Sequence, residues 1–159
     1  MKSVIVYYSY SGNTKKVAQE LADYLKATSE VAMIELVAQD EPRSFLGQCR
    51  RALWHGKAKI ESVNTNLLAY DIICFGTPVW AFGPAPALNT YLEECSGLCG
   101  KTAVLFTTYG SGTGNDWCLT YMRGILAKKG IDDFKRFSVQ QYKVDDAEFV
   151  QSVIKETLK

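Results

Sequence analysis

Short, continuous runs of apolar residues alternate along this chain with segments in which apolar residues recur every three or four positions. The runs are rich in β-branched and aromatic residues, which is typical of strands buried on both faces of a sheet. Five such runs occur, at 3–9 (SVIVYYS), 30–36 (EVAMIEL), 70–80 (YDIICFGTPVW), 101–110 (KTAVLFTTYG) and 134–140 (FKRFSVQ). The last run is the most polar, which predicts a strand at the edge of the sheet.

The segments between these runs have helical spacing, with apolar residues on one side and charged residues between them. One helix is predicted directly after residue 14, a second from about Phe45 to Trp54, and a third with Pro86 in its first turn, where a missing N–H costs nothing. The fourth and fifth helices have candidate caps at Asn115 or Asp116 and at Asp145 or Asp146. Helices and strands are therefore expected to alternate along the chain.

This alternation predicts one α/β domain over residues 1–159: an open five-stranded parallel sheet with helices on both faces. In such sheets ligands bind at the carboxyl ends of the strands, where the winding reverses. The loops after the first, third and fourth strands also have unusual compositions. We therefore expect these three loops to form one site.

The loop after the first strand reads SYSGNT, from Ser9 to Thr14, and leads directly into a helix. A tight, hydroxyl-rich turn at a helix start gathers free backbone N–H groups and the positive helix end, which suits an anion. The loop has neither the lysine of GxxxxGK[ST] nor the glycines of GxGxxG, so its neutral donors suit a single terminal phosphate. The alternative is an ordinary helix cap formed by Asn13 or Ser11.

The loop after the third strand reads GTPVWAFGPAPA, and we expect the strand to end in its Gly-Thr-Pro turn. Prolines stiffen this loop, and it holds Trp80 and Phe82 at the ligand-binding edge. A planar aromatic ligand would stack on such rings. Packing of one of the two rings into the core is the alternative.

The loop after the fourth strand reads TTYGSGTGND. Its glycines let peptide N–H groups approach the edge of a ligand ring, and Tyr109 offers a stacking face or a hydroxyl. Together the three loops predict a pocket for a phosphate, a ring face and a ring edge.

Composition adds mainly exclusions. The formal net charge of +1 gives no general attraction to nucleic acid, and no apolar run approaches the roughly 18 residues of a membrane span. The five cysteines form no CxxC pair and lack the partners for a zinc site, so we interpret them as thiols of a reducing, cytoplasmic compartment. We nominate no catalytic acid or base, and we interpret His55 as a surface or packing residue.

The segments VYYSYSGNTKKVA and IICFGTPVWAFGPAPALNTYL, with the glycine-rich loop after AVLFTTY, resemble flavodoxin-like FMN-binding proteins over essentially the whole chain. The family's phosphate loop commonly reads [ST]-x-[ST]-G-x-T, which Ser9, Ser11, Gly12 and Thr14 match. The resemblance implies a short-chain flavodoxin-like fold that binds FMN. It places the cofactor on the residues Ser9, Tyr10, Ser11, Gly12, Asn13, Thr14, Thr77, Pro78, Val79, Trp80, Ala81, Phe82, Tyr109, Gly110, Ser111 and Gly112.

The chain departs from acidic flavodoxins in its near-neutral charge, in Ala81 after Trp80, and in having Asp116 as the one acid of its third loop. Three hypotheses stay open. The first is a protein that transfers electrons between redox partners. The second is an NAD(P)H-dependent FMN oxidoreductase that reduces quinones, flavins or similar small-molecule acceptors. The third is a domain that has kept the fold without the cofactor, and for each we expect a monomer or a homodimer.

Overall fold

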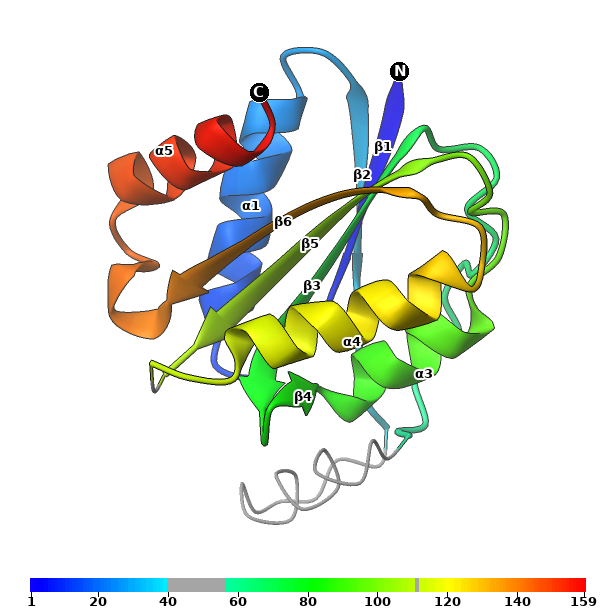
Figure 1. Ribbon diagram of the computed structural model, residues 1–159, viewed down its shortest axis with the longest axis horizontal. Coiled ribbons are helices and arrows are strands. Elements are labelled where there is room, and N and C mark those ends of the chain that lie inside the picture. Colours follow the sequence, from blue (N-terminus) through cyan, green and yellow to red (C-terminus); the bar gives the residue numbers. More distant parts are fainter. Residues whose placement is uncertain (40–56, 111) are drawn as a thin grey trace.

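The computed structural model describes residues 1–39, 57–110 and 112–159 (Figure 1). The helix predicted from Phe45 to Trp54 and His55 lie outside the described residues. The elements are β1 (Lys2–Tyr7), α1 (Asn13–Leu25), β2 (Glu30–Glu35), β3 (Ile72–Trp80), β4 (Gly83–Pro84), α3 (Pro86–Glu94), β5 (Thr102–Tyr109), α4 (Asn115–Ala127), β6 (Asp133–Gln140), the 3₁₀ turn η1 (Gln141–Lys143) and α5 (Ala147–Thr157).

Five strands form a parallel sheet in the order β2-β1-β3-β5-β6, and the short β4 pairs antiparallel with the end of β3. The central strand β3 is in register with both neighbours, because Phe75 lies opposite Val6 of β1 and Leu105 of β5. The polar strand β6 is at one edge, as its composition predicted. The expected α/β fold with a five-stranded parallel sheet is therefore confirmed.

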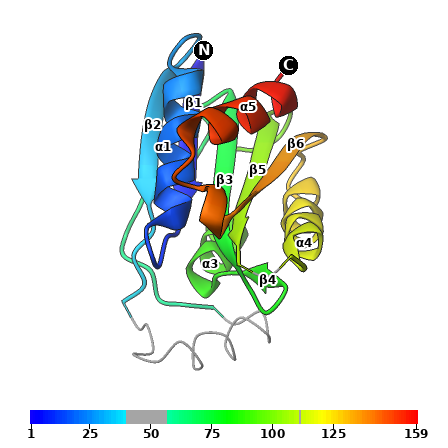
Figure 2. The same ribbon diagram turned by 90° about the vertical axis from the view of Figure 1, so that its left-hand side faces the viewer.

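Helices cover both faces of the sheet: α1 and α5 lie on one face, and α3 and α4 lie on the other (Figures 1 and 2). The molecule has two hydrophobic cores, one on each face of the sheet, and successive residues of a strand pack into them alternately. In β1, Ile5 packs with the α1 and α5 side, whereas Val4 and Val6 pack with the α3 and α4 side. All three side chains are fully buried, which accounts for the continuous apolar character of this strand.

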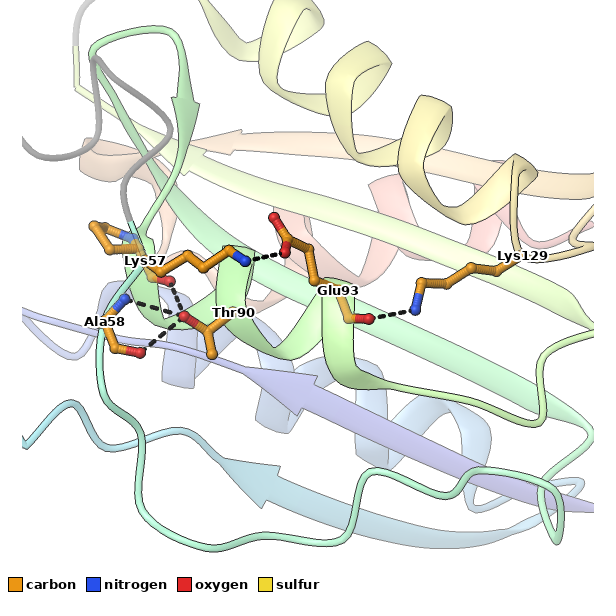
Figure 3. Close-up of polar contacts among 6 residues, drawn as sticks. Lys57, Ala58, Thr90, Glu93 and Lys129 are labelled. Atoms are coloured by element: carbon orange, nitrogen blue, oxygen red, sulfur yellow. Dashed lines mark hydrogen bonds and ion pairs between the residues drawn. The ribbon is translucent and has the colours of Figure 1, made fainter.

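The connection that leads into β3 is fixed to α3 by the hydroxyl of Thr90 (Figure 3). The amide N–H of Ala58 donates to Thr90 Oγ1 at 3.0 Å, and this oxygen lies 2.8 Å from the carbonyl oxygen of Ala58. Near the end of α3, Glu93 makes two further contacts. Lys57 Nζ lies 2.5 Å from Glu93 Oε2, and Lys129 Nζ donates to the Glu93 carbonyl oxygen at 2.6 Å. The contacts of Ala58 with Thr90 and of Lys57 with Glu93 hold residues 57–58 alongside α3.

No helix within the described residues is both long and apolar enough to span a membrane.

Candidate functional site

The carboxyl ends of the parallel strands meet at one end of the molecule. In Figure 1 the arrowheads of β3, β5 and β6 point toward that end, where α4 begins and the β3–β4 hairpin lies. The loop from β1 to α1 lies at the same end, because β1 runs parallel to β3. The topology therefore brings together the three loops that the sequence singled out.

The first loop leaves backbone donors available at the start of α1. Gly12 caps this helix with φ +87°, a left-handed conformation that suits glycine, and no side chain caps the helix. The alternative of an ordinary helix cap formed by Asn13 or Ser11 is therefore wrong. Ser9 Oγ accepts from the amide N–H of Lys15 at 3.2 Å. Within the described part of the chain, the amide N–H groups of Asn13 and Thr14 have no acceptor.

The two lysines of the first helical turn form ion pairs with other elements. Lys15 Nζ lies 2.7 Å from Glu35 Oε2 at the end of β2, and Lys16 Nζ lies 2.5 Å from Asp145 Oδ1. The loop from Ser9 to Asn13 therefore presents neutral donors only. A positive helix end with free N–H groups and no capping side chain fits one phosphate group.

Glu35 also accepts a hydrogen bond from Tyr7. The Tyr7 hydroxyl donates to Glu35 Oε2 at 3.2 Å, beside the Lys15 ion pair. Burial, reinforced by the Glu35 carboxylate, raises the pKa of Tyr7 to about 12. This phenol therefore stays protonated at neutral pH and acts as a donor that ties the ends of β1 and β2 together.

Thr14 differs from the rest of the loop in its burial. It is 1% exposed, whereas Tyr10 and Ser11 are exposed and Gly12 and Asn13 are half-buried. Its hydroxyl oxygen lies 2.8 Å from the hydroxyl oxygen of Thr108 on β5. Thr14 therefore connects the start of α1 to the sheet.

The second loop is a hairpin. The strand does not end in the Gly-Thr-Pro turn that we expected, because β3 continues to Trp80 and pairs there with Gly83. The turn consists of Ala81 and Phe82, both at positive φ (+46° and +67°). Positive φ at both central positions is the conformation of a type I′ hairpin turn.

Thr77 fixes the base of this hairpin. Its buried hydroxyl oxygen accepts from the amide N–H of Ala85 at 2.9 Å and lies 3.0 Å from the carbonyl oxygen of Pro78. Pro78 is buried, and Val79 and Ala81 are half-buried. Thr77 thus holds the hairpin in shape, which the sequence did not reveal.

The aromatic residues of the site divide into one buried and two exposed rings. Trp80 is 6% exposed and packs edge-on against Tyr8 and Tyr10, with ring centroids 5.6 and 5.8 Å apart. Phe82 is 59% exposed and Tyr10 is 49% exposed. Of these three rings, those of Tyr10 and Phe82 are accessible, while Trp80 supports Tyr10 from the core. Trp117 at the start of α4 and Tyr142 after β6 are also exposed at this edge.

The third loop lies against the tip of the hairpin. Gly114 caps α4 with φ +95°, in place of the expected Asn115 or Asp116, and no side chain caps this helix. A Cβ atom at Gly114 would lie only 2.7 Å from Cδ1 of Phe82, so the Phe82 ring packs directly on this glycine. Tyr109 is half-buried and Gly110 and Gly112 are exposed, whereas Ser111 lies outside the described residues.

Sequence reasoning missed a buried polar group beside the site. Within the described residues, the buried hydroxyl of Tyr8 has no hydrogen-bond partner, and the same holds for both side-chain polar atoms of Asn89 on α3. In the sequence Tyr8 reads as an apolar residue of the first strand. The one feature that could have identified it as a site residue is its position directly before Ser9, the first residue of the loop. An unpartnered hydroxyl in contact with Trp80 is a group that a polar ligand atom can satisfy.

Within the part of the chain that the structure describes, no group of three His, Cys, Asp or Glu side chains could hold a metal ion. The chemistry that this edge supports is the binding of a phosphorylated, planar ligand.

The fold of this chain is similar to that of several solved flavoprotein structures. The chain is similar in structure to a flavoprotein from Lactobacillus acidophilus NCFM solved in complex with FMN (TM-score 0.65, 22% identity, 92% of this chain and 98% of that chain). It is also similar to oxidised flavodoxin 2 from Bacillus cereus (TM-score 0.64, 21% identity, 99% and 98%). A third similar structure is the apo form of an NADH:FMN oxidoreductase (TM-score 0.67, 20% identity, 99% and 88%).

These three likenesses confirm the fold. The model of the family described as NADPH-dependent FMN reductase matches residues 1–141, which is most of the chain. The expectation of a flavodoxin-like FMN-binding family is thereby confirmed, and the chain belongs to the NADPH-dependent FMN reductase family.

Proposed function

We propose that this chain binds FMN at the carboxyl edge of its sheet and uses it to transfer electrons between redox partners. The observation that carries this proposal is the uncapped start of α1, where free N–H groups meet a loop of neutral donors and both nearby lysines are paired elsewhere. An anion with one phosphate group matches such a cradle better than a magnesium-bound triphosphate.

In this proposal each loop has a separate task. The residues from Ser9 to Thr14 hold the phosphate. The hairpin residues from Thr77 to Phe82 border the ribityl chain and the ring, with Tyr10 and Phe82 offering accessible aromatic faces. The third loop, with Tyr109, Gly110 and Gly112, borders the far edge of the ring.

Bound FMN supplies the electron-transfer chemistry, and the protein supplies orientation and electrostatics. The hydrogen bond from Ala85 to Thr77 keeps the hairpin rigid, so that Phe82 is held against Gly114. Asp116, in the first turn of α4, is the one acidic residue of the third loop. Electrostatic repulsion from acidic side chains of this loop therefore disfavours a negatively charged ligand ring only weakly.

A second candidate function is an NAD(P)H-dependent FMN oxidoreductase that reduces quinones, flavins or similar acceptors. The family match over residues 1–141 favours it. The sequence contains no second nucleotide-binding motif, but a reduced nicotinamide can stack directly on a flavin without one. The exposed rings of Tyr10 and Phe82 leave room for an aromatic donor at this edge.

Two measurements test the proposal and separate the candidates. Apo-protein titrated with FMN should bind it with 1:1 stoichiometry and bind riboflavin, which lacks the phosphate, more weakly. Equal affinity for the two, or no uptake of either, would refute the phosphate cradle. The FMN-loaded protein is then mixed with NADH or NADPH without oxygen. Rapid bleaching of flavin absorbance supports the oxidoreductase, and its absence together with reduction by photochemical electron donors supports the electron carrier.

A further inference from the structure

Thr14 and Thr108 form an isolated pair of hydroxyl groups inside the molecule. Thr14 is in the first turn of α1, Thr108 is near the end of β5, and each is 1% exposed. Their hydroxyl oxygens are 2.8 Å apart. Within the described residues neither side chain has another hydrogen-bond partner.

The pair contains one more proton than it can use. Each threonine hydroxyl carries one proton and can accept two hydrogen bonds. One of the two protons makes the bond between the oxygens, and the other has no acceptor among the described residues. Since both residues are almost fully buried, bulk water does not supply an acceptor either. A buried O–H group without an acceptor lowers the stability of the protein. A ligand oxygen that accepts a hydrogen bond from this group removes the cost.

We propose that Thr108 is a positioning residue of the phosphate site: it donates its proton to Thr14 Oγ1 and thereby reserves the Thr14 proton for the phosphate. This inference rests on the proposed function. Thr14 is the residue of the pair that belongs to the loop, and its own amide N–H has no acceptor among the described residues. With Thr108 as the donor, the Thr14 hydroxyl and amide both become donors at the same helix end.

The opposite proton arrangement makes a different prediction. If Thr14 donates to Thr108, the Thr14 proton is consumed inside the protein. Replacing Thr108 by valine would then release that proton, and FMN would bind as well as before or more tightly. The direction of the bond is therefore open to a binding measurement.

The test compares FMN with riboflavin on apo-protein, with dissociation constants read from flavin fluorescence. Thr108→Val is nearly isosteric and removes the hydroxyl, whereas Thr108→Ser retains it. We expect Thr108→Val to lower the preference for FMN over riboflavin by up to about fivefold, the effect of one hydrogen bond, because the Thr14 hydroxyl keeps its proton but loses the partner that orients it. Thr108→Ser should keep the wild-type preference. The matched control is Thr107→Val. The buried Thr107 hydroxyl that it removes lies 2.9 Å from Ser138 Oγ on the neighbouring strand. This substitution should weaken both ligands equally or neither.

A merely structural role for Thr108 would reduce FMN and riboflavin binding by the same factor, and that result would overturn the inference, as would unchanged or tighter FMN binding. If circular dichroism shows that Thr108→Val does not fold, Thr108→Ala takes its place. A double-mutant cycle adds a second criterion: in a Thr14→Val background, loss of the Thr108 hydroxyl should no longer change the preference. A wild-type protein that does not prefer FMN to riboflavin would refute the phosphate cradle itself, and this inference with it.

Discussion

The hydroxyl oxygen of Thr77 accepts a hydrogen bond from the amide N–H of Ala85 at 2.9 Å, across the base of the hairpin that ends β3. Both residues are fully buried, so this is the partner that satisfies the Ala85 amide. The bond joins the last part of the central strand to the residue that precedes α3. The hairpin and the start of α3 are thus held as one unit next to the proposed cofactor.

Replacing Thr77 by valine should therefore destabilise the protein by about 1–3 kcal/mol, because it leaves a buried N–H without an acceptor. Urea unfolding of the apo-protein, followed by circular dichroism, measures this change. Thr77→Ser retains the acceptor and should recover most of the lost stability. Equal stability of Thr77→Val and the wild type would show that the bond contributes nothing to the fold.

Gly114 and Gly124 should respond in opposite ways to the same substitution. Gly114 has φ +95°, and a Cβ atom there would lie 2.7 Å from the Phe82 ring, so Gly114→Ala should cost about 1–2 kcal/mol for the backbone alone. Gly124 is an exposed position inside α4 with nothing within 4 Å of an added Cβ. There, alanine should stabilise the helix by about 0.5–1 kcal/mol.

Thermal unfolding of the two variants beside the wild type checks this pair. A shift of the melting temperature in the same direction for both would contradict the assignment of Gly114 as a left-handed cap. Because Gly114 also supports Phe82, Gly114→Ala should weaken FMN binding, whereas Gly124→Ala should not.

The sequence predicted the alternating fold well because the relevant signals are local. Apolar runs and helical spacing depend on neighbouring residues, and the parallel sheet follows from their alternation. The predicted cap of α5 is confirmed, since Asp146 Oδ1 accepts from the amide N–H of Phe149 at 3.0 Å, but the cap of α4 was mispredicted for a physical reason. Asn115 and Asp116 are good capping residues, but Gly114 alone can take the left-handed backbone that the approach of Phe82 requires. Such a requirement comes from tertiary contact and leaves no mark on local composition.

The site was predictable as a set of loops but not in its internal geometry. Trp80 and Phe82 are two residues apart and equally aromatic, yet the register with β4 buries one and exposes the other. Both turn residues, Ala81 and Phe82, have positive φ although neither is a glycine, so the local composition does not indicate this conformation. The contact between Thr14 and Thr108 joins positions 94 residues apart. Pairings of this kind depend on the folded sheet.

Phe82 should matter for the ligand more than for the fold. Its side chain is 59% exposed, so Phe82→Ala should change the stability of the apo-protein by no more than about 0.5 kcal/mol. Loss of a stacking face should weaken FMN binding by roughly two- to tenfold. Leu68→Ala is the matched control, since Leu68 is 70% exposed and lies in the turn that precedes β3, away from the carboxyl end of that strand. Unchanged FMN affinity in Phe82→Ala would remove this ring from the proposed site.

Tyr7 should make the stability of the protein depend on pH in the alkaline range. Burial and the Glu35 carboxylate raise the pKa of Tyr7 to about 12 in the folded protein, whereas tyrosine in an unfolded chain ionises near pH 10. Above about pH 10 the unfolded chain loses this proton more readily than the folded protein does. The stabilisation is therefore complete below about pH 10 and is lost as the pH rises to about 12.

The advantage of the wild type over Tyr7→Phe in free energy of unfolding should accordingly shrink between pH 9 and pH 12. Urea unfolding at a series of pH values measures it. Tyr142→Phe is the control for the loss of a tyrosine hydroxyl at an exposed position, because Tyr142 is 73% exposed. A wild-type advantage over Tyr7→Phe that stays level toward pH 12 would show that the Tyr7 hydroxyl ionises as it does in the unfolded chain, and one that grows would show that it ionises more readily in the folded protein.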